Sequence, residues 1–368
     1  MPDAETRQRR RAALRGLEFI YRVAREPESF ADYGSDLLSC FYFVAQTSAD
    51  ANLRRRALAM GRERARRWRR DNPRLPARAD AETVLDFIHG AYAADQFAAP
   101  DDSLKAQVRR AAARLTPRDF LCFDPREEPP PRDVPERCEC GERNARGRRR
   151  CVGCRRALEA MSRYGVWYDA LVRAYSAARY GVSLGATYED VLRWLPALRP
   201  YPASDAGENP DFYDAVYAVT HVVYTLNDYS RYRLSPRWLP REFAFMKANL
   251  RVAIGREDPE MVGEFLDVLR AFGLGDSHAL VRAGVSYLLA TQKEDGSWGD
   301  HDEEETYARY HTTWTAVDGL REYRWRGVGL SFPEVKPLLL RCARDGAATA
   351  RRARRNSARR SHTTRTAK

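Results

Sequence analysis

The sequence predicts an all-α protein built of helical hairpins and interrupted by one small cysteine-rich unit. Segments of about 12 to 18 residues with apolar positions at helical spacing alternate with loops that carry Gly, Pro or acidic residues. No stretch shows the sustained alternation of apolar and polar residues that is typical of half-buried strands. Four of the seven cysteines fall within the 17 residues from Cys138 to Cys154.

The composition is that of a folded protein with a strongly basic C-terminal segment. The 368 residues are 44% hydrophobic, which is enough for a large core, and no apolar run reaches 18 residues. The charged N-terminus lacks an apolar segment of signal-peptide type, so we expect a cytoplasmic protein without a membrane span. The segment 344–368 holds nine Lys or Arg residues and one Asp, and it accounts for +8 of the net charge of +12. We expect this basic tail to be disordered, either simply solvated or in non-specific contact with nucleic acid or anionic membrane.

The first half of the chain contains helical patterns separated by recognisable stops. We expect helices over 5–28, around 37–45, and over 52–70, 82–96 and 101–115. Pro73 and Pro76 stop the third of these, and two aspartates open the fifth. The proline-rich stretch that follows marks a linker, so the boundaries are a helical part over 1–124 and a linker with the cysteine unit over 125–156.

Helical patterns resume after the cysteine unit and define a second helical part over 157–343. We expect helices over 157–179, 187–198, 211–229, 242–254, 278–292 and 333–344. Another helix carries Pro259 in its first turn and ends near 272. A further helix follows the acidic run 302–305, which resembles a helix start.

The cysteine unit has the spacing of a zinc ribbon. Cys138-x-Cys140 and Cys151-x-x-Cys154 flank ten residues, and each pair offers two thiolates from a tight turn, which suits tetrahedral Zn²⁺. Four thiolates leave no open position, so the zinc would be structural. A pair of disulfides is the alternative, although a cytosolic chain keeps its thiols reduced. The remaining Cys40, Cys122 and Cys342 are scattered and are expected in the core.

Three segments repeat one arrangement of an acidic residue, a histidine seven positions later and an aromatic residue three further on. They are Glu82–Leu85–His89–Tyr92, Asp214–Tyr217–His221–Tyr224 and Glu304–Tyr307–His311–Trp314, the last continuing to Asp318. Steps of three and four place each set on one helix face. His221 and His311 are 90 residues apart, which is two units of about 45, the period of a helix pair with its loops.

One short motif resembles a known superfamily. Gln292-Lys-Glu-Asp-Gly296-Ser-Trp298 fits the Q-x3-G-x-W pattern of the terpenoid cyclases and prenyltransferases, and the resemblance covers roughly 265–325. It implies an α/α toroid of helical hairpins in which Gln292 caps a helix end, Trp298 packs on a neighbouring helix and catalysis takes place in a central cavity. The D-x-D-D acid motif of squalene-hopene-type cyclases is absent from the sequence, so the resemblance implies the fold more than the reaction.

Within such a toroid the histidines would lie on inner helices. We hypothesise that His89, His221 and His311 converge on a metal ion (zinc, copper or iron) that has an open position. The catalytic candidates are His221, His311, Tyr307 and Asp228. Tyr217, Tyr224, Tyr310 and Trp314 would complete the cavity wall, and Asp214, Asp228, His301, Asp302 and Glu304 are candidate supporting ligands. General acid–base catalysis without a metal, and plain core packing of the histidines, both remain open.

Two functions follow from these features. The first is a metalloenzyme, either a cyclase, a transferase or an oxidase, that acts on a small apolar or aromatic molecule or on a peptide side chain. The second is a non-catalytic scaffold whose ribbon and tail engage nucleic acid or an acidic partner. Arginines surround the cysteines, but no aromatic residue lies between Cys138 and Arg156, which disfavours nucleic acid.

Overall fold

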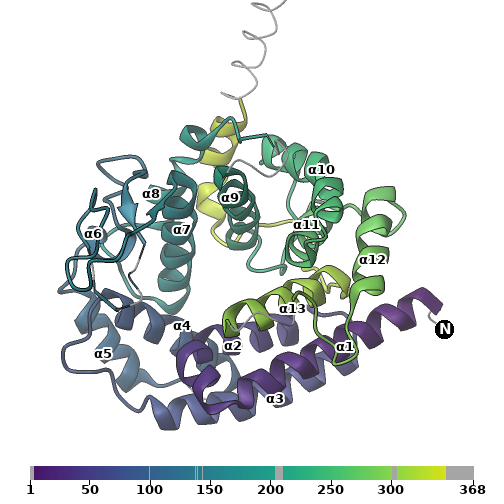
Figure 1. Cartoon of the computed structure of the whole chain (residues 1–368), viewed down its shortest axis with the longest axis horizontal. Coiled ribbons are helices and arrows are strands. Elements are labelled where there is room, and N and C mark those ends of the chain that lie inside the picture. The colour runs from purple at the N-terminus through teal and green to yellow at the C-terminus, as the bar shows by residue number, and fades with distance from the viewer. Residues whose placement is uncertain are drawn as a thin grey trace, which may run out of the picture.

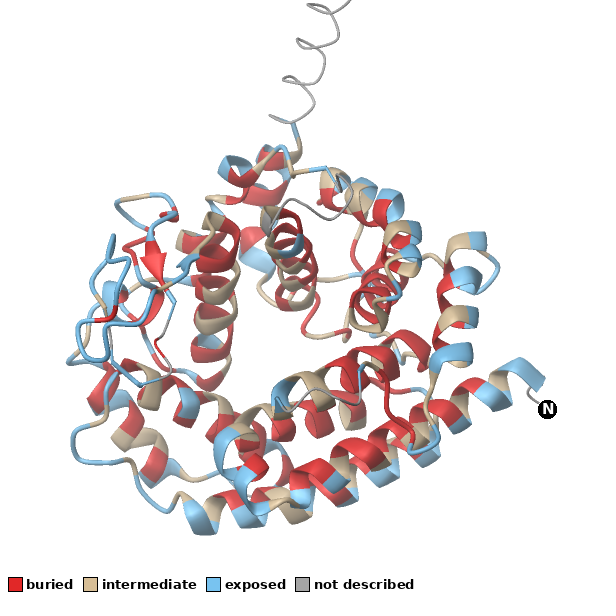
Figure 2. Cartoon of the chain, in the orientation of Figure 1, coloured by how far each residue is buried: buried red, intermediate tan, exposed pale blue. Residues whose placement is uncertain are grey.

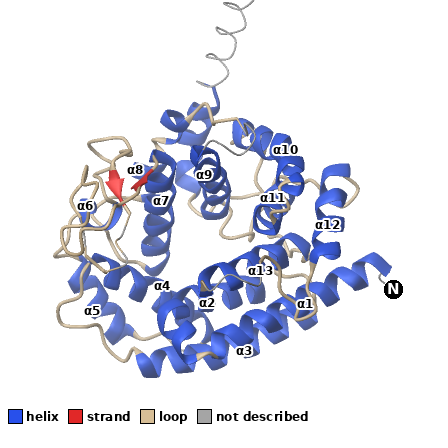
Figure 3. Cartoon of the chain, in the orientation of Figure 1, coloured by secondary structure: helices blue, strands red, loops and turns tan. Residues whose placement is uncertain are grey.

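The described chain is mostly helical and carries one four-cysteine cluster (Figures 1 and 3). The computed structural model describes residues 4–98, 100–136, 138, 140–142, 144–203, 210–300 and 305–344. The first helices are α1 (Ala4–Arg25), α2 (Pro27–Thr47), α3 (Ala51–Asp71), α4 (Ala81–Phe97), α5 (Asp102–Ala112) and α6 (Pro117–Leu121). After the cysteine unit come α7 (Arg163–Tyr180), α8 (Tyr188–Leu192), α9 (Pro210–Leu226), α10 (Pro240–Gly255), α11 (Pro259–Ala271), α12 (Ala279–Thr291) and α13 (Thr306–Leu320). Residues 336–344 form a last helical segment.

Six of these helices contact one another in a closed circuit. In order they are α2, α4, α7, α9, α11 and α13, and α13 contacts α2 again. The helices between them in the chain pack on the outside of this circuit: α1 on α13 and α2, α3 on α2 and α4, α5 on α4, α6 and α8 on α7, and α10 and α12 on α11 (Figure 1). The chain therefore alternates between an outer and an inner position.

The outer helices are amphipathic because one side faces solvent. In α1 the residues Ala13, Leu17 and Ile20 are fully buried, while most of the arginines of the helix remain exposed or half-buried. Figure 2 shows the same mixture of exposed and buried residues along α1 and α3. The inner helix α11 is instead buried over almost its whole length, from Met261 to Ala271. Such a helix can keep charged residues only where they face polar partners or a cavity.

Glycine allows α11 and α13 to approach very closely. A Cβ on Gly263 would lie 2.4 Å from the carbonyl carbon and oxygen of Thr315, and a Cβ on Gly319 would lie 2.9 Å from the Cα of Gly263. The two backbones are thus almost in contact. This approach brings the polar side chains of α11 next to the histidine stripe of α13.

The Q-x3-G-x-W segment joins the first helix to the last hairpin. Gln292 Nε2 donates to the carbonyl oxygens of Ala12 in α1 and Gly296, both at 2.9 Å. The buried indole of Trp298 donates to the carbonyl of Leu288, near the end of α12, at 2.8 Å. The carbonyl of Leu288 is therefore satisfied by Trp298, and Gln292, which is the C-cap residue of α12, connects this helix end to α1.

Helix α6 is not among the helices expected from the sequence, and three of the expected helices differ clearly from those of the structure. The helix expected around 37–45 begins at Pro27, bends at Tyr33 and so includes Asp36. The helix expected from 157 begins only at Arg163, because Ser162 caps it and Ala160–Met161 (β2) pairs with Val134–Pro135 (β1). The helix expected over 187–198 is split into α8 and a 3₁₀ turn, Leu195–Leu198.

No described helix combines the length and the apolar character that a membrane crossing requires. His301, Asp302 and Glu304, together with all of the basic tail after Arg344, lie outside the described residues.

Candidate functional site

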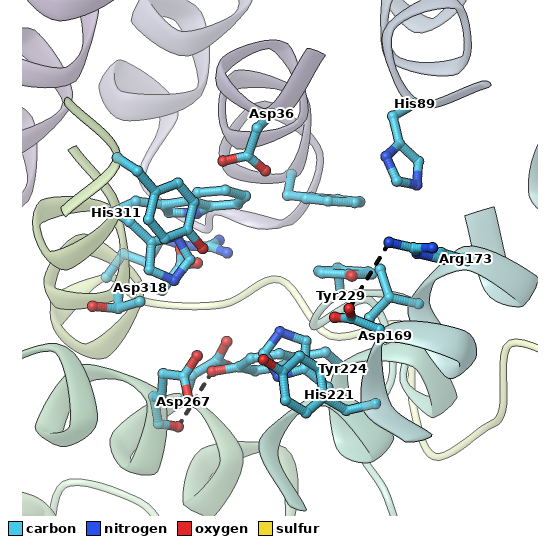
Figure 4. A pocket seen from close by; sticks show the side chains of 18 residues that line it. Asp36, His89, Asp169, Arg173, His221, Tyr224, Tyr229, Asp267, His311 and Asp318 are labelled. Atoms are coloured by element: carbon cyan, nitrogen blue, oxygen red, sulfur yellow. Dashed lines mark hydrogen bonds and ion pairs between the residues drawn. The ribbon is translucent and has the colours of Figure 1, made fainter. Parts of the chain in front are cut away.

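A cavity of about 360 Å³ lies between the six helices of the circuit. Every one of these helices contributes to its wall, and Figure 4 shows the side chains approaching it from different sides. Its lining side chains are Asp36, Phe43, His89, Tyr168, Asp169, Val172, Arg173, His221, Tyr224, Tyr229, Glu264, Asp267, Tyr307, His311, Trp314, Thr315, Asp318 and Arg321. All three histidines of the repeated pattern are among them.

His221 presents a defined nitrogen to this cavity. Its Nδ1 lies 2.8 Å from the carbonyl oxygen of Tyr217, and only a protonated nitrogen can donate to that oxygen. In the neutral ring the lone pair therefore sits on Nε2. Burial lowers the pKa of His221 to about 4, with a smaller contribution from His311, so the ring is neutral at physiological pH. Neutral imidazole with a fixed lone pair can accept a proton or bind a metal ion.

His311 lies between an aromatic ring and a carboxylate. Tyr307 stacks on it with ring centroids 4.6 Å apart and planes at 17°. Its Nε2 is 3.8 Å from Oε1 of Glu260, while its Nδ1 is buried without a described hydrogen-bond partner. Glu260 is itself held by the hydroxyl of Tyr217 at 2.7 Å and that of Thr312 at 3.0 Å. The predicted residues His311 and Tyr307 thus both line the cavity.

His89 faces the cavity from α4, on the side of Arg173 (Figure 4). Burial, with the Arg173 charge as a second cause, lowers the pKa of His89 to about 4. Its Nε2 is buried and has no hydrogen-bond partner among the described residues. The three histidines share one cavity but are not gathered into a ligand set. Across the described residues, the four cysteines are the one group of His, Cys, Asp or Glu with three or more ligand atoms all within 4.8 Å of one another.

The cavity also contains a set of carboxyl groups, of which the sequence analysis singled out only Asp318, at the end of the third histidine stripe. Glu264 and Asp267 come from α11 and are almost completely buried. Burial raises the pKa of Glu264 well above its ordinary value and that of Asp267 to about 7. Burial also raises the pKa of Asp36 and of Asp318. A signal was present in the sequence, because the segment from Glu260 to Asp267 places acids at steps of four and three on a helix that is otherwise apolar.

Two arginines line the cavity, and both are already engaged. Arg173 lies 3.1 Å from Oε1 of Glu82, 3.9 Å from Asp169, and donates to the carbonyl of Phe120. Arg321 pairs with Asp318 at 2.5 Å and donates to the hydroxyl of Thr47 at 2.7 Å. Glu82, the acidic member of the first repeat, therefore serves as a partner for Arg173.

Asp228 lies behind the cavity wall and holds a strained turn. Its carboxylate accepts from the Tyr175 hydroxyl at 2.7 Å and pairs with Arg179 at 3.4 Å and Arg231 at 2.8 Å. Asp228, Tyr229 and the next residue, Ser230, all have positive φ (57°, 48° and 68°), which is costly for residues with a Cβ. The turn brings Tyr229 to the cavity. Asp228 is not among the lining residues, so its position is that of an anchor for Tyr229.

The predicted wall and supporting residues divide into two groups. Tyr224, Tyr307 and Trp314 line the cavity, whereas Tyr217 and Tyr310 stand behind it. The Tyr310 hydroxyl donates to Asp36 at 2.7 Å, as Tyr217 does to Glu260. Asp214 lies beside Gly165 at the start of α7 and is not a lining residue.

The four cysteines form a compact cluster at the other candidate site. The Sγ atoms of Cys138 and Cys154 are 3.3 Å apart, and those of Cys140 and Cys151 are 3.5 Å apart. All four lie within 4.8 Å of one another. Tetrahedral zinc with Zn–S bonds of about 2.3 Å requires S···S separations of about 3.8 Å, so the donor set fits a zinc-sized ion. The backbone N–H of Cys154 is the main cause that lowers the pKa of Cys151 to about 6, which favours a thiolate.

Tight turns hold these cysteines. In the first turn the N–H of Gly141 donates to the carbonyl of Cys138 at 2.8 Å, and Gly141 has φ 81°. In the second turn Arg155 occupies the left-handed position, with φ 66°. Of the other cysteines, Cys40 and Cys342 are buried as expected, and Cys40 is not a cavity-lining residue. The prediction that Cys122 belongs to the core is wrong. Cys122 is exposed, and it is the left-handed residue at the C-terminal end of α6.

The cavity thus combines proton acceptors, buried carboxyl groups and aromatic walls, and the cysteine cluster offers four sulfur ligands. The first arrangement can exchange protons with a bound small molecule, and the second can hold a metal ion. Comparisons of the chain with models of protein families, with curated proteins and with solved structures found no match.

Proposed function

We propose that the described helices form an α/α toroid of the terpenoid-cyclase and prenyltransferase type. The closed circuit of α2, α4, α7, α9, α11 and α13, with the remaining helices outside it, supports this proposal. The contacts of Gln292 and Trp298 support it as well, because they join α1 to the end of α12 where such a ring would close. The four cysteines would then form a zinc ribbon inserted between two parts of the ring, and a reducing compartment such as the cytoplasm would keep their thiols able to bind.

We propose further that the protein is an enzyme that acts on a small molecule or a peptide side chain in the central cavity. The observation that carries this proposal is the presence of both His221 and Glu264 in the wall of one cavity. His221 is neutral and offers its Nε2 lone pair, while burial raises the pKa of Glu264 and so favours its protonated form. A base without its proton and an acid with its proton, both facing one substrate, can move a proton from one position of that substrate to another.

The neighbouring residues would assist this proton transfer. His311 lies 3.8 Å from Glu260 and can exchange a proton with the substrate in the same space. Tyr307 covers one face of the His311 ring and limits its rotation. Asp228 would act indirectly by holding Tyr229 in the wall.

A turnover experiment tests the enzyme proposal without a known substrate. Purified protein is incubated with a metabolite extract, and mass spectrometry follows compounds whose abundance changes with time. The wild type should convert at least one compound, and His221→Gln and Glu264→Gln should each slow that conversion by about 100-fold or more. His278→Asn is the matched control, because His278 caps α12 away from the cavity. Equal conversion by wild type and the His221 variant would contradict the proposed base.

A second metal ion is the alternative way to use the same histidines. The hydrogen bond from His221 Nδ1 to a backbone carbonyl favours it, since metal-binding histidines are commonly held in this way. His311 and a carboxyl group of α11 would complete the ligand set after side-chain rotation. The separation of His89, His221 and His311 in the structure weighs against a centre that uses all three together.

Metal analysis separates these possibilities. A zinc ion that disappears in Cys138→Ser and Cys154→Ser, with no second metal, supports the cysteine site and a metal-free cavity. A second metal that disappears in both His221→Ala and His311→Ala supports a metalloenzyme. If both histidine variants retain all bound metal, the cavity does not hold a metal through these residues.

A further inference from the structure

We propose that the central cavity binds an organic cation, an amine or a guanidinium compound, for which Asp36 and Asp267 supply the negative charge and Glu264 supplies a hydrogen-bond acceptor. This inference rests on the proposed function, because it names the substrate class of the same site. It comes from the balance of charges around the cavity and from the nature of its walls.

The carboxyl groups outnumber the cationic groups of the cavity. Asp36, Asp169, Glu264, Asp267 and Asp318 line it, against the guanidinium groups of Arg173 and Arg321. Both arginines are held in ion pairs and backbone or hydroxyl contacts of their own. The Arg321 charge lowers the pKa of Asp267 in part, but neither arginine forms a described hydrogen bond or ion pair with Asp36, Glu264 or Asp267.

Three of the carboxyl groups have only neutral hydrogen-bond donors. Asp36 accepts from the Tyr310 hydroxyl at 2.7 Å, and Asp267 accepts from the Ser230 hydroxyl at 2.7 Å. Glu264 is 1% exposed, and its Oε2 has no hydrogen-bond partner among the described residues. A buried carboxyl oxygen that faces a cavity without a partner is costly unless a ligand supplies a donor. A ligand with positively charged N–H groups would supply both a donor and the missing charge.

The walls of the cavity suit an organic cation better than a bare metal ion. Phe43, Tyr168, Tyr224, Tyr229, Tyr307 and Trp314 line it. Tyr229 stacks on Phe43 with centroids 4.1 Å apart and on Tyr224 at 5.9 Å, while Tyr307 and Trp314 contact the His311 ring. Aromatic faces attract ammonium and guanidinium groups and contact the attached carbon atoms. A metal ion would leave most of this aromatic surface and most of the 360 Å³ of space unused.

Isothermal titration calorimetry with matched pairs of probes tests the proposal. The cations are 3,3-dimethylbutylamine, phenethylamine and butylguanidine, and their respective neutral counterparts are 3,3-dimethylbutanol, 2-phenylethanol and butylurea. At least one cation should bind, and its neutral counterpart should bind at least tenfold more weakly. Equal binding of the two members of a pair, or failure of all three cations to bind, overturns the proposal. Binding of Mg²⁺ or Zn²⁺ in the cavity with no bound organic cation overturns it as well.

Variants locate the binding to the proposed carboxyl groups. Asp36→Asn and Asp267→Asn should each weaken cation binding at least tenfold, with circular dichroism used to confirm that the variants remain folded. Asp86→Asn is the matched control, because Asp86 accepts from the Ser35 hydroxyl just as Asp267 accepts from Ser230, but it does not line the cavity. Weakening by Asp86→Asn to the same extent would contradict the assignment.

A proton-release measurement adds a second, independent readout. A bound cation favours the charged form of nearby carboxyl groups, so binding near pH 7 should expel protons into the buffer. Titrations in two buffers of different ionisation enthalpy measure this release, which should decrease in Asp267→Asn. Binding without any proton release in the wild type contradicts the role given to Asp267.

The inference and the proposed function can fail separately. If His221→Gln still binds cations and still converts substrate at the wild-type rate, the proposed ligand class stands and the proposed role of His221 as a base is wrong. If turnover depends on His221 but the compound converted is neutral or anionic, His221 stands as the base and the proposed ligand class is wrong.

Discussion

Oδ2 of Asp228 lies 2.8 Å from Nη1 of Arg231, and this ion pair closes the left-handed turn that carries Tyr229 to the cavity. Three successive residues with positive φ are costly, at roughly 1–2 kcal/mol each. The contacts that Asp228 makes with Arg231, Arg179 and Tyr175 offset this cost. The stability of the turn and the shape of the cavity wall therefore depend on the same carboxylate.

Removing this carboxylate should destabilise the protein. We expect Asp228→Ala to lower the free energy of unfolding by about 3–5 kcal/mol, because it leaves the half-buried Arg179 and Arg231 without their shared partner. Asp228→Asn keeps an acceptor for the Tyr175 hydroxyl and should cost less. Urea unfolding monitored by circular dichroism measures both. A loss below about 1 kcal/mol for the alanine variant would show that the turn does not depend on Asp228.

The close approach of α11 and α13 leads to a second prediction. Gly263→Ala should destabilise the fold by several kcal/mol or prevent folding, because its Cβ would lie 2.4 Å from backbone atoms of Thr315 that cannot move aside. Gly255→Ala is the matched control at the end of α10, where nothing lies within 4 Å of the added Cβ. It should be neutral or stabilise by up to about 1 kcal/mol. Thermal unfolding of the two variants measures this difference. Equal melting temperatures would show that the contact between α11 and α13 does not require glycine at position 263.

The sequence predicts the helices and part of the cavity for clear physical reasons. Helical spacing and proline stops are local signals, and they locate most elements of the described chain correctly. The three repeated histidines lie on one cavity because each occupies the polar position of an inner helix. The helix start at Pro27 could not be predicted in this way, because polar residues dominate that segment and packing stabilises the helix.

The carboxyl groups of the cavity were missed for a different reason. Glu264 and Asp267 are isolated acids in an apolar helix, and sequence alone does not reveal which neighbours surround them. Asp36 precedes the helix expected around 37–45, although it lies on α2 beside Tyr310. Their significance depends on the closure of the helix circuit, which brings residues from six distant segments together.

Glu260 offers a test of the polar network behind His311. Glu260→Ala should cost about 2–4 kcal/mol in folding free energy, because the hydroxyls of Tyr217 and Thr312 both lose their acceptor. Glu260→Gln retains an acceptor oxygen and should cost less than half as much. Chemical denaturation of the two variants measures the difference. Equal losses would indicate that the negative charge, and not the hydrogen bonding, stabilises this part of the helix pair.

The cysteine cluster should bind one zinc ion per chain. Replacement of zinc by Co²⁺ should produce the absorption bands of tetrahedral thiolate coordination, which Cys151→Ser should remove. Cys122→Ser is the matched control, because Cys122 is an exposed cysteine outside the cluster. Chelation should increase proteolysis of the segment between Asp133 and Leu158 while the helical circular dichroism signal is largely retained. If the four cysteines form disulfides and the purified protein binds no metal, the zinc prediction is wrong.

The buried carboxyl group of Asp267 should make stability depend on pH in a defined direction. Its pKa is about 7 in the folded protein and about 4 in an unfolded chain, so the unfolded state loses its proton first as the pH rises. Stability from this residue is therefore lost between about pH 4 and pH 7, with a slope of about 1.4 kcal/mol per pH unit. Asp267→Asn should remove that slope, so the stability of the variant relative to wild type should increase as the pH rises across this range. His221→Gln should instead gain stability relative to wild type as the pH falls. The reason is that the pKa of His221 falls to about 4 on folding, so the wild type loses stability as the pH drops below about 6.5. Urea unfolding at several pH values measures both, and a difference between Asp267→Asn and wild type that is independent of pH would contradict the assignment.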